Sequence, residues 1–354
     1  MKKKLRIGIV FGGRSSEHEV SLLSARSVID AIDRSKYGIS LIAIAKDGRW
    51  FGMRKESCLL NASDSKKIAL DRASMGELAI HPGKEGIGPV DVVFPVMHGT
   101  YGEDGSIQGL LRMLDLPFVG PDILGSAVGM DKDVAKRLLR DAGIPVADFF
   151  CVRAVDEIGF QKAKKALGMP VFIKPANQGS SVGVSKASDP SSFRKALKEA
   201  FSYDTKVLIE QAVPGREIEV AVLGNEEPEA SVPGEIVPHH DFYSYEAKYI
   251  DEDGAGLVIP ADLTPGQARN ARSLALRVFR TLELEGMSRV DFFMTKDGEF
   301  VVNEVNTIPG FTKISMYPKL WAASGLTYPK LIDRLIRLAL ERHTRRKRLK
   351  TARR

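Results

Sequence analysis

Cysteine is scarce in this chain, which has only Cys58 and Cys151 among its 354 residues. Two isolated cysteines make neither a disulfide framework nor a zinc site, so the sequence favours a reducing compartment. Long apolar runs are lacking too, and no stretch is long enough to cross a bilayer. The basic start resembles that of a signal peptide, but the apolar run after it is short, contains Arg6 and ends at Gly12 and Gly13. We predict a soluble, cytoplasmic protein with no membrane partner.

An excess of positive over negative charge is lacking over most of the chain, although the formal net charge is +7. Residues 342–354 hold eight Lys or Arg and no acid, which leaves the rest of the chain near neutral. The high pI would suit a nucleic-acid-binding protein, but the excess charge belongs to one terminal segment. We predict a frayed basic tail over 342–354 and no nucleic-acid partner.

Two common nucleotide-binding patterns are also missing, Gly-x-x-x-x-Gly-Lys-Ser/Thr and Gly-x-Gly-x-x-Gly. Their absence weakens the P-loop interpretation and that of a nicotinamide dehydrogenase, which the opening strand and its two glycines would otherwise suggest. The chain does have a Gly/Ser loop at 175–183, directly after an apolar strand that ends at Lys174. Its N–H groups and hydroxyls could fold over phosphate oxygens, with the lysine supplying charge. A plain hairpin turn is the alternative.

The order of apolar patterns predicts an α/β protein, and 354 residues exceed the size of one core. Strand patterns at 5–11, 39–45 and 90–97 alternate with helical ones, as in an open sheet that carries ligand loops at its carboxyl edge. Turn signals at Gly120-Pro121 and at Pro214-Gly215 mark two boundaries. We predict domains over 1–120, 121–212 and 213–341, followed by the tail.

Two loops at that carboxyl edge carry polar residues. Ser16 and Glu19 have the spacing of a capping box, which would leave Glu17 to hold a substrate ammonium. A second acid favoured by the helix dipole explains Glu17 equally well. The other loop begins with His98, for which a loop hydrogen bond is the usual explanation.

A β-hairpin is predicted around the Asp-Gly dipeptide at 297–298, taken as a two-residue turn. Counting outward puts Asp291 opposite Glu304 and Arg289 opposite Asn306, all four on one face. The other face would be buried through Phe292, Met294, Val301 and Val305.

Opposed carboxylates destabilise a sheet unless a cation lies between them. Oxygen ligands without His or Cys suit a hard ion, so Asp291, Glu304 and the neutral Asn306 predict Mg2+ that holds phosphate oxygens. Arg289 would then be available for an anionic substrate. A surface hairpin with solvated carboxylates is the alternative.

The remaining candidate site residues are two acids and the residues of a predicted lid. Glu210 and Glu217 flank a turn and could accept hydrogen bonds from an adenine amine and a ribose, although such acids often serve only solubility. Residues 235–256 lack a clear period and are rich in aromatic residues, which favours a lid containing Lys248 and Tyr249.

Five segments carry a resemblance to a known family. They are Gly-Gly-Arg-Ser-Ser-Glu-His-Glu-Val-Ser at 12–21, His-Gly-Thr-Tyr-Gly-Glu-Asp-Gly at 98–105, the flap at 174–183, Glu-Ala-Lys-Tyr at 246–249, and Arg-Val-Asp at 289–291 with Glu-Val-Asn-Thr-Ile-Pro-Gly at 304–310. In this order they resemble the D-alanine–D-alanine ligase family of the ATP-grasp superfamily. The resemblance implies a three-domain ATP-grasp architecture, in which an open parallel sheet domain precedes two α+β domains that clamp ATP.

The resemblance also implies a reaction. ATP would phosphorylate one D-alanine to an acyl phosphate, and the amine of a second would attack it, giving D-alanyl-D-alanine for peptidoglycan precursors, ADP and phosphate. Two Mg2+ ions, replaceable by Mn2+, would be held by Asp291, Glu304 and Asn306. A homodimer is implied as well. A ligase that makes D-alanyl-D-lactate, or another ATP-grasp amino-acid ligase, is the alternative.

The same resemblance implies residue roles at the first substrate site. Glu17 would hold the ammonium of the first D-alanine and link through Ser180 to Tyr249, with His98 and Lys248 nearby. Related D-lactate ligases have Phe or His at the position of Tyr249, so this tyrosine favours an amine acceptor.

Further roles follow for the oxyanion, the second substrate and the nucleotide. Arg289 and the backbone N–H of Gly310 would form the oxyanion hole, and Ser315 with Met316 would hold the second carboxylate. The nucleotide would be bound by Lys132, Lys174, Ser180, Ser181, Glu210, Glu217 and Lys248.

Overall fold

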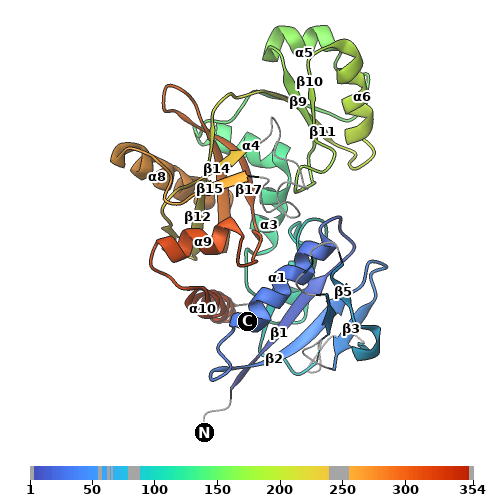
Figure 1. Cartoon of the computed structure of the whole chain (residues 1–354), viewed down its shortest axis with the longest axis vertical. Helices are drawn as coiled ribbons and strands as arrows, with labels where there is room; N and C mark the ends of the chain where they lie inside the picture. The colour runs from blue at the N-terminus through green and yellow to red at the C-terminus, as the bar shows by residue number, and fades with distance from the viewer. Residues whose placement is uncertain are drawn as a thin grey trace.

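The computed structural model describes residues 4–54, 58–61, 64, 67–78, 88–238 and 255–350. Three main sheets follow one another along the long axis of the molecule, with helices packed against each (Figure 1). A small separate pair joins β4 (Leu59–Leu60) to β5 (Ala69–Leu70), and a short 3-10 turn covers Arg72–Ser74. The predicted α/β class is confirmed, whereas the domain limits at 120 and 212 stay predictions.

The N-terminal sheet has the strand order β6-β3-β2-β1-β7. Its strands are β1 (Leu5–Gly12), β2 (Tyr37–Ile44), β3 (Trp50–Met53), β6 (Met75–Glu77) and β7 (Val92–Val96). Strand β1 is parallel to β2 on one side and to β7 on the other. Since the chain crosses from one side of β1 to the other, the loops after β1 and β7 flank a crevice at the carboxyl edge. Helices α1 (His18–Ala31) and α2 (Ser106–Met113) follow these two loops.

The central sheet is antiparallel, with the order β10-β9-β11-β8. It consists of β8 (Phe149–Val152), β9 (Val171–Pro175), β10 (Ser185–Ala187) and β11 (Val207–Gln211). Helices α5 (Phe160–Leu167) and α6 (Pro190–Ala200) share a core with Ile173 and Ile209. Because side chains alternate along a strand, Lys174 and Glu210 lie together on the opposite face.

The C-terminal sheet has the order β15-β14-β12-β16-β17, with β13 paired to β12. Its strands are β12 (Arg216–Gly224), β13 (Glu229–Ala230), β14 (Gly234–Pro238), β15 (Ala255–Val258), β16 (Gly286–Met294) and β17 (Phe300–Asn306). One face shares a core with α8 (Pro265–Thr281) and α4 (Lys132–Asp141), and α3 (Ile123–Met130) precedes α4. On the other face, β12 is apolar at Ala221 and Leu223 but acidic at Glu217 and Glu219.

The irregular lid predicted over 235–256 is wrong at both of its ends. Residues 235–238 belong to β14 and 255–256 to β15, and these strands pair antiparallel. The remaining residues of that segment, 239–254, lie outside the described residues, and with them Lys248 and Tyr249.

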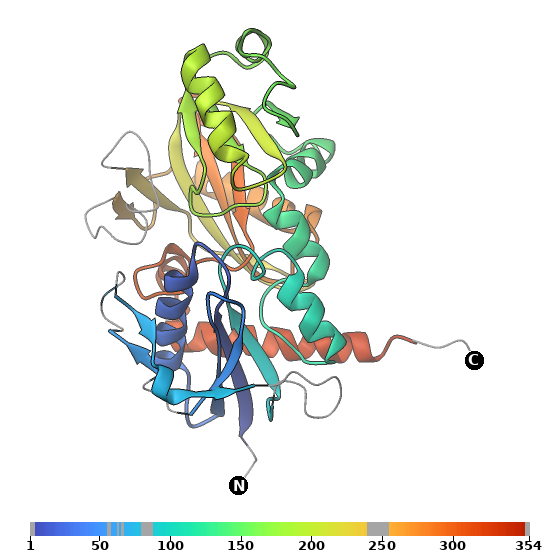
Figure 2. The same cartoon turned by 90° about the vertical axis from the view of Figure 1, so that its right-hand side faces the viewer.

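The last two helices join the N-terminal and C-terminal sheets. Helix α9 (Met316–Ala323) and the long α10 (Tyr328–Lys347) share one apolar core with α1 and β1, which includes Phe11, Leu22, Tyr317 and Leu335. Helix α10 crosses beside the N-terminal sheet (Figure 2). The Tyr37 hydroxyl on β2 donates to Asp333 on α10 at 2.6 Å.

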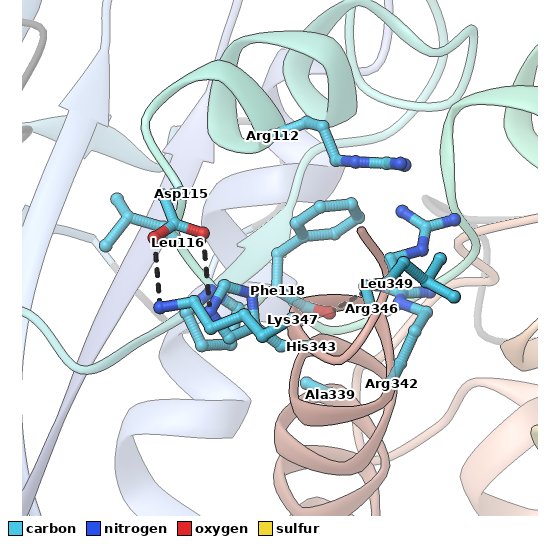
Figure 3. Close-up of a pocket in the computed structure, with 11 residues that line it drawn as sticks. Arg112, Asp115, Leu116, Phe118, Ala339, Arg342, His343, Arg346, Lys347 and Leu349 are labelled. Carbon is cyan, nitrogen blue, oxygen red and sulfur yellow. Dashed lines mark hydrogen bonds and ion pairs between the residues drawn. The ribbon is translucent and has the colours of Figure 1, made fainter. Parts of the chain in front are cut away.

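The frayed basic tail predicted over 342–354 is wrong for residues 342–347. Helix α10 continues to Lys347, and Arg342 is only 3% exposed. Its guanidinium donates to the carbonyls of Phe118 at 2.7 Å and Gly120 at 2.6 Å, and lies 4.5 Å from the ring centre of Phe118 (Figure 3). Other ion pairs of this helix end join Arg346 to Asp122 and Lys347 to Asp115. Carbonyls and carboxylates of residues 115–122 thus compensate positive charge that was predicted to face solvent.

Among the described residues, no helix is both long enough and apolar enough to cross a membrane. Cys58 and Cys151 are not joined by a disulfide. Burial raises the pKa of the Cys151 thiol to about 11, so this thiol stays protonated near neutral pH.

Candidate active site

The Gly/Ser flap of the central domain closes onto Glu17 of the N-terminal domain. Ser180 and Ser181 both have left-handed backbone conformations, with φ of 50° and 62°. Consecutive left-handed residues other than glycine are uncommon, so contacts must impose this shape. The Ser180 hydroxyl donates a hydrogen bond to the buried Glu17 carboxylate. The structure therefore joins Glu17 and Ser180, the first two members of the expected chain to Tyr249.

Two glycines make room for this carboxylate. A Cβ atom at Gly99 would lie 2.5 Å from Glu17 Oε2, and one at Gly179 would lie 2.8 Å from the same atom. Both distances are too short for non-bonded atoms, so a side chain at either position would displace the carboxylate. Glycine thus allows the N-terminal loop and the flap to close around one carboxylate.

The capping box predicted at Ser16 and Glu19 is wrong. Helix α1 begins at His18, and Glu17 is its N-cap residue. Among the described residues 4–54, no side chain forms a hydrogen bond at this cap. Glu19 pairs with Lys46 at 2.5 Å instead. Because the N-cap residue is Glu17 and not Ser16, Glu19 is the second helical residue, one short of the third position that a capping box requires.

Buried lysines surround Glu210 where the central sheet faces α4. The Glu210 carboxylate lies 2.6 Å from Lys174 and 2.9 Å from Lys136. Burial alone would raise the pKa of Glu210, but the two ammonium groups hold it below its ordinary value. Lys132 donates to the flap carbonyl of Gln178 at 2.6 Å, and burial lowers its pKa. These lysines form a positive wall under the flap, which suits phosphate groups.

The C-terminal hairpin has the predicted pairing at the site. Asp291 faces Glu304 and Arg289 faces Asn306 across β16 and β17. Lys132 Nζ lies 3.7 Å from Glu304, so the hairpin meets the lysine wall. The cleft between the central and C-terminal sheets therefore contains opposed carboxylates beside cations.

The turn of the hairpin differs from the prediction. The N–H of Thr295 bonds the carbonyl of Glu299 at 2.9 Å, so the loop has three residues and ends at Gly298, whose φ is 81°. The register shifts once more between Asp291 and Phe292, because Asn303 is an extra residue in β17. Because of this bulge, Asp291 pairs with Glu304 as predicted. Between the bulge and the turn, however, the side chains of β17 lie on the opposite face from the predicted one. Val301, predicted in the core, pairs with Phe293 on the site face.

Arg289 lies between two acids. Its Nε and one terminal nitrogen donate to the two oxygens of Asp291, each at 2.7 Å. Its Nε also lies 2.8 Å from Glu219 on the neighbouring strand, where Glu219 pairs in register with Asp291. Asn306 Nδ2 donates to Asp291 at 2.9 Å. The guanidinium is therefore held in one plane by the carboxylates around it.

The hairpin donors fit a hard divalent cation. Asp291, Glu304 and Asn306 supply oxygen ligands from one face, which suit Mg2+. Nowhere among the described residues, the hairpin included, do three His, Cys, Asp or Glu side chains form a cluster that could hold a metal. Two carboxylates and an amide are an incomplete shell, so phosphate oxygens of a nucleotide would have to complete it.

His98 lies buried in the loop between β7 and α2, with both ring nitrogens bonded inside the protein. Its Nδ1 is 3.0 Å from the Ile308 carbonyl and its Nε2 is 2.9 Å from the Ser24 hydroxyl. Burial lowers the pKa of His98 to about 4, so the ring is neutral. The loop hydrogen bond considered from the sequence is present.

Glu103, in the same loop, is a residue that the sequence analysis did not select. Its carboxylate accepts from the N–H of Ile308 at 2.7 Å and from that of Gly99 at 3.0 Å. Burial, with the nearby charge of Glu17, raises the pKa of Glu103 to about 8.

Two other site residues that the sequence analysis did not select are Lys136 and Glu219. Spacing could have found them, since Lys136 is one turn after Lys132 and Glu219 two residues after Glu217.

The segment after the hairpin carries the remaining candidates. Gly310 is half-buried, and Ser315 is the N-cap residue of α9. The Ser315 hydroxyl lies 2.7 Å from that of Thr312. The Met316 side chain is buried in the core, so only its backbone N–H, at the start of α9, suits a substrate carboxylate.

The flap and the hairpin enclose little space. A cavity of about 20 Å³ is lined by the flap residues Gln178 and Gly179 together with Glu103, Lys132 and Glu304. A wider cavity of about 470 Å³ lies between the flap and the N-terminal loops, lined in part by Arg14, Lys46 and Tyr203. The structure thus has a closed flap.

Two family models match this chain. One, described as D-ala D-ala ligase N-terminus, matches residues 6–121, and the other, D-ala D-ala ligase C-terminus, matches residues 138–337. A D-alanine–D-alanine ligase of Oceanobacillus iheyensis is 54% identical, over 100% of this chain and 99% of the relative. D-alanine–D-alanine ligase A of Escherichia coli K12 is 53% identical, over 99% of each.

Solved structures agree with these matches. The D-alanine-D-alanine ligase from Coxiella burnetii aligns with a TM-score of 0.84 and 38% identity, covering 97% of this chain and 96% of that one. The VanG D-Ala:D-Ser ligase from Enterococcus faecalis aligns with a TM-score of 0.83 and 34% identity, covering 95% and 100%. By fold, by sequence and by both family models, the chain belongs to the D-alanine–D-alanine ligase family.

Proposed function

We propose that this protein joins two D-alanine molecules at the expense of ATP, giving D-alanyl-D-alanine for peptidoglycan precursors together with ADP and phosphate. The observation that carries the proposal is the pair Asp291 and Glu304, opposed in register and flanked by Lys132 and Arg289. Phosphoryl transfer needs such an arrangement, because catalysis depends mainly on positioning and on neutralising phosphate charge.

The first half-reaction takes place under the flap. Glu17 holds the ammonium of the first D-alanine, and Ser180 ties the flap to that carboxylate, with Tyr249 next in the chain and His98 nearby. The substrate carboxylate attacks the terminal phosphate of ATP, forming an acyl phosphate and ADP. Closure of the flap excludes water, which would otherwise hydrolyse this intermediate.

The nucleotide lies between the two ATP-grasp halves. Lys132 and Lys174 contact phosphates, while Ser180 and Ser181 cover them from the flap. Glu210 and Glu217 accept hydrogen bonds from the adenine amine and the ribose. Lys248 also binds the nucleotide. The contacts of Glu210 with Lys136 and Lys174 support its place at the nucleotide, since they fix its carboxylate and keep it ionised.

Two Mg2+ ions, replaceable by Mn2+, are proposed at Asp291, Glu304 and Asn306. When bound, they screen the charge that repels a carboxylate from a phosphate. Arg289, whose guanidinium already lies against Asp291, is the neighbouring cation of the chain itself.

The second half-reaction forms the peptide bond. The carboxylate of the second D-alanine lies at Ser315 and Met316, where the start of α9 offers N–H groups. Its amine attacks the acyl phosphate, and phosphate leaves. Arg289 and the N–H of Gly310 stabilise the oxygen that becomes negative in the tetrahedral intermediate.

The assembly and the compartment are part of the same proposal. The protein acts as a homodimer in the cytoplasm, where ATP is available, and takes D-alanine and ATP as its partners. Sedimentation equilibrium tests the dimer, and a monomeric mass at assay concentration would contradict it.

The acceptor is tested by one experiment. Phosphate release and product mass are compared with D-alanine, L-alanine, D-lactate and D-serine, the last because the aligned VanG protein is titled a D-Ala:D-Ser ligase. We expect D-alanine to give the dipeptide with the highest turnover, and equal turnover with L-alanine would contradict the stereochemical assignment. Tyr249→Phe should raise the share of D-lactate product, and an unchanged share would remove Tyr249 as the specificity residue.

A further inference from the structure

The peptide unit of Ile308 is bonded at both of its polar groups by the loop after β7. Its N–H donates to Glu103 Oε1 at 2.7 Å, and its carbonyl lies 3.0 Å from His98 Nδ1. The second oxygen of Glu103 accepts the N–H of Gly99 at 3.0 Å. The Glu103 carboxylate therefore connects the loop beside Glu17 to the segment that follows the β16–β17 hairpin.

The geometry determines which nitrogen of His98 carries the proton. The Ile308 carbonyl can only accept, so Nδ1 must be the donor and Nε2 the acceptor. Nε2 then accepts from the Ser24 hydroxyl at 2.9 Å, and Ser24 Oγ accepts the N–H of Phe311 at 3.3 Å. The segment 308–311 is thus bonded at both ends, with Gly310 between the bonded residues.

These contacts are shielded from water. His98 is 3% and Glu103 is 7% exposed, and Ile308 is 1% exposed. Water does not compete for the groups of a buried hydrogen bond, so such bonds fix a backbone more strongly than surface contacts do. A neutral amide in place of Glu103 would offer one oxygen to two N–H groups and could satisfy only one of them.

We propose that Glu103 and His98 are positioning residues that hold the 308–310 segment, so that the Gly310 N–H points at the oxygen of the tetrahedral intermediate. The inference rests on the proposed function, because that function gives Gly310 its role. Neither residue needs to touch substrate or nucleotide. Their loss should therefore slow peptide-bond formation more than formation of the acyl phosphate.

Glu103→Gln tests the inference by rapid-quench measurement of ADP and product in single turnovers. We expect ADP to form at a rate within about threefold of wild type, while product formation falls about 10–100-fold, the range for a slightly displaced catalytic group. The Michaelis constant for ATP should stay within about threefold. Equal losses in both steps, or no loss in either, would overturn the proposal.

Glu157→Gln is the matched control. Glu157 also accepts a backbone N–H, from Arg153 at 2.7 Å, but it is exposed and far from the site in sequence. It should behave as wild type in both steps. Thermal unfolding of each variant shows whether it is folded at the assay temperature.

His98→Asn provides a second, independent measurement should Glu103→Gln fail to fold. Its amide can keep a donor near Nδ1 but loses the bond to Ser24, so it should show the same selective loss of product formation. If His98→Asn loses ADP formation equally, the inference fails. Product identity in wild type tests the proposed function separately, and the ratio of ADP to product is measurable with whichever acceptor the enzyme uses.

Discussion

Asp291 on β16 lies in register with Glu304 on β17, and each acid has its own cation. Arg289 bonds both oxygens of Asp291 at 2.7 Å, and Lys132 lies 3.7 Å from Glu304. Arg289 is shared with Glu219, whose carboxylate lies 2.8 Å from its Nε, so three carboxylates face two cations. This remaining negative charge is what a divalent ion with phosphate ligands would neutralise.

Removal of either acid should therefore reduce catalysis far more than stability. For Asp291→Asn and Glu304→Gln we expect kcat to fall by at least about 100-fold, because the charge that holds the metal is lost. Binding of ADP, followed by calorimetry with and without Mg2+, should lose its Mg2+ dependence. Glu299→Gln, at the exposed tip of the same hairpin, is the control and should keep both properties. Near-normal turnover in either site variant would contradict the metal assignment.

The flap contact predicts an effect on the first substrate. Ser180→Ala removes the hydroxyl that donates to Glu17, and a hydrogen bond to a charged group is worth about 1.5–3 kcal/mol. We expect the Michaelis constant of the tighter-binding D-alanine to rise about tenfold or more, measured by phosphate release against D-alanine concentration. Ser202→Ala, which removes an exposed hydroxyl bonded to Glu199, should leave it unchanged. A loss confined to ATP binding would argue against the contact with Glu17.

The hairpin shows what a sequence can and cannot predict. Alternation and the Asp-Gly signal predict the correct partners for Asp291 and Arg289, because two errors cancel: the loop has one residue more than expected, and Asn303 adds another. A bulge depends on tertiary contacts of one strand with its neighbours, so no local pattern indicates it. The consequence is visible at Val301, which lies on the site face and not in the core.

Ion-pair and hydrogen-bond partners that lie far apart in the sequence could not be predicted either. Local spacing predicts a capping role for Glu19, but the helix starts one residue later than expected and Glu19 pairs with Lys46, on the loop after β2. Lys136 had no assigned role until folding brought β11 and Glu210 beside α4. Composition predicts that a basic segment such as 342–354 extends into solvent, since nothing near it in sequence can accept its hydrogen bonds. The carbonyl acceptors come from residues more than 200 positions earlier.

The buried Glu103 predicts a pH dependence of stability. Its pKa is raised from the ordinary value of 4.5 to about 8, so the folded state binds this proton more tightly than the unfolded chain does. Its contribution to the free energy of unfolding is full below about pH 4.5 and is lost as pH rises through about 8. Glu103→Gln lacks this titration. Compared with the variant, wild type should therefore become less stable by at least about 1 kcal/mol between pH 5 and pH 9.

Denaturant unfolding of both proteins at several pH values measures this difference. Other groups titrate in the same range, but they do so in both proteins and cancel in the comparison. A difference in unfolding free energy that does not change with pH would show that Glu103 is already ionised throughout this range. The positioning role of Glu103 does not depend on the result.

Arg342 predicts that the basic end of α10 is structural. Its guanidinium donates to the carbonyls of Phe118 and Gly120 and stacks on the Phe118 ring in a buried place. Arg342→Ala would leave two buried acceptors without donors and would remove the stacking, which should cost about 3 kcal/mol. Arg348→Ala, an exposed arginine less than two turns later, should cost less than about 0.5 kcal/mol. Denaturant unfolding measures both, and equal stabilities for the two variants would show that this helix end contributes little to the fold.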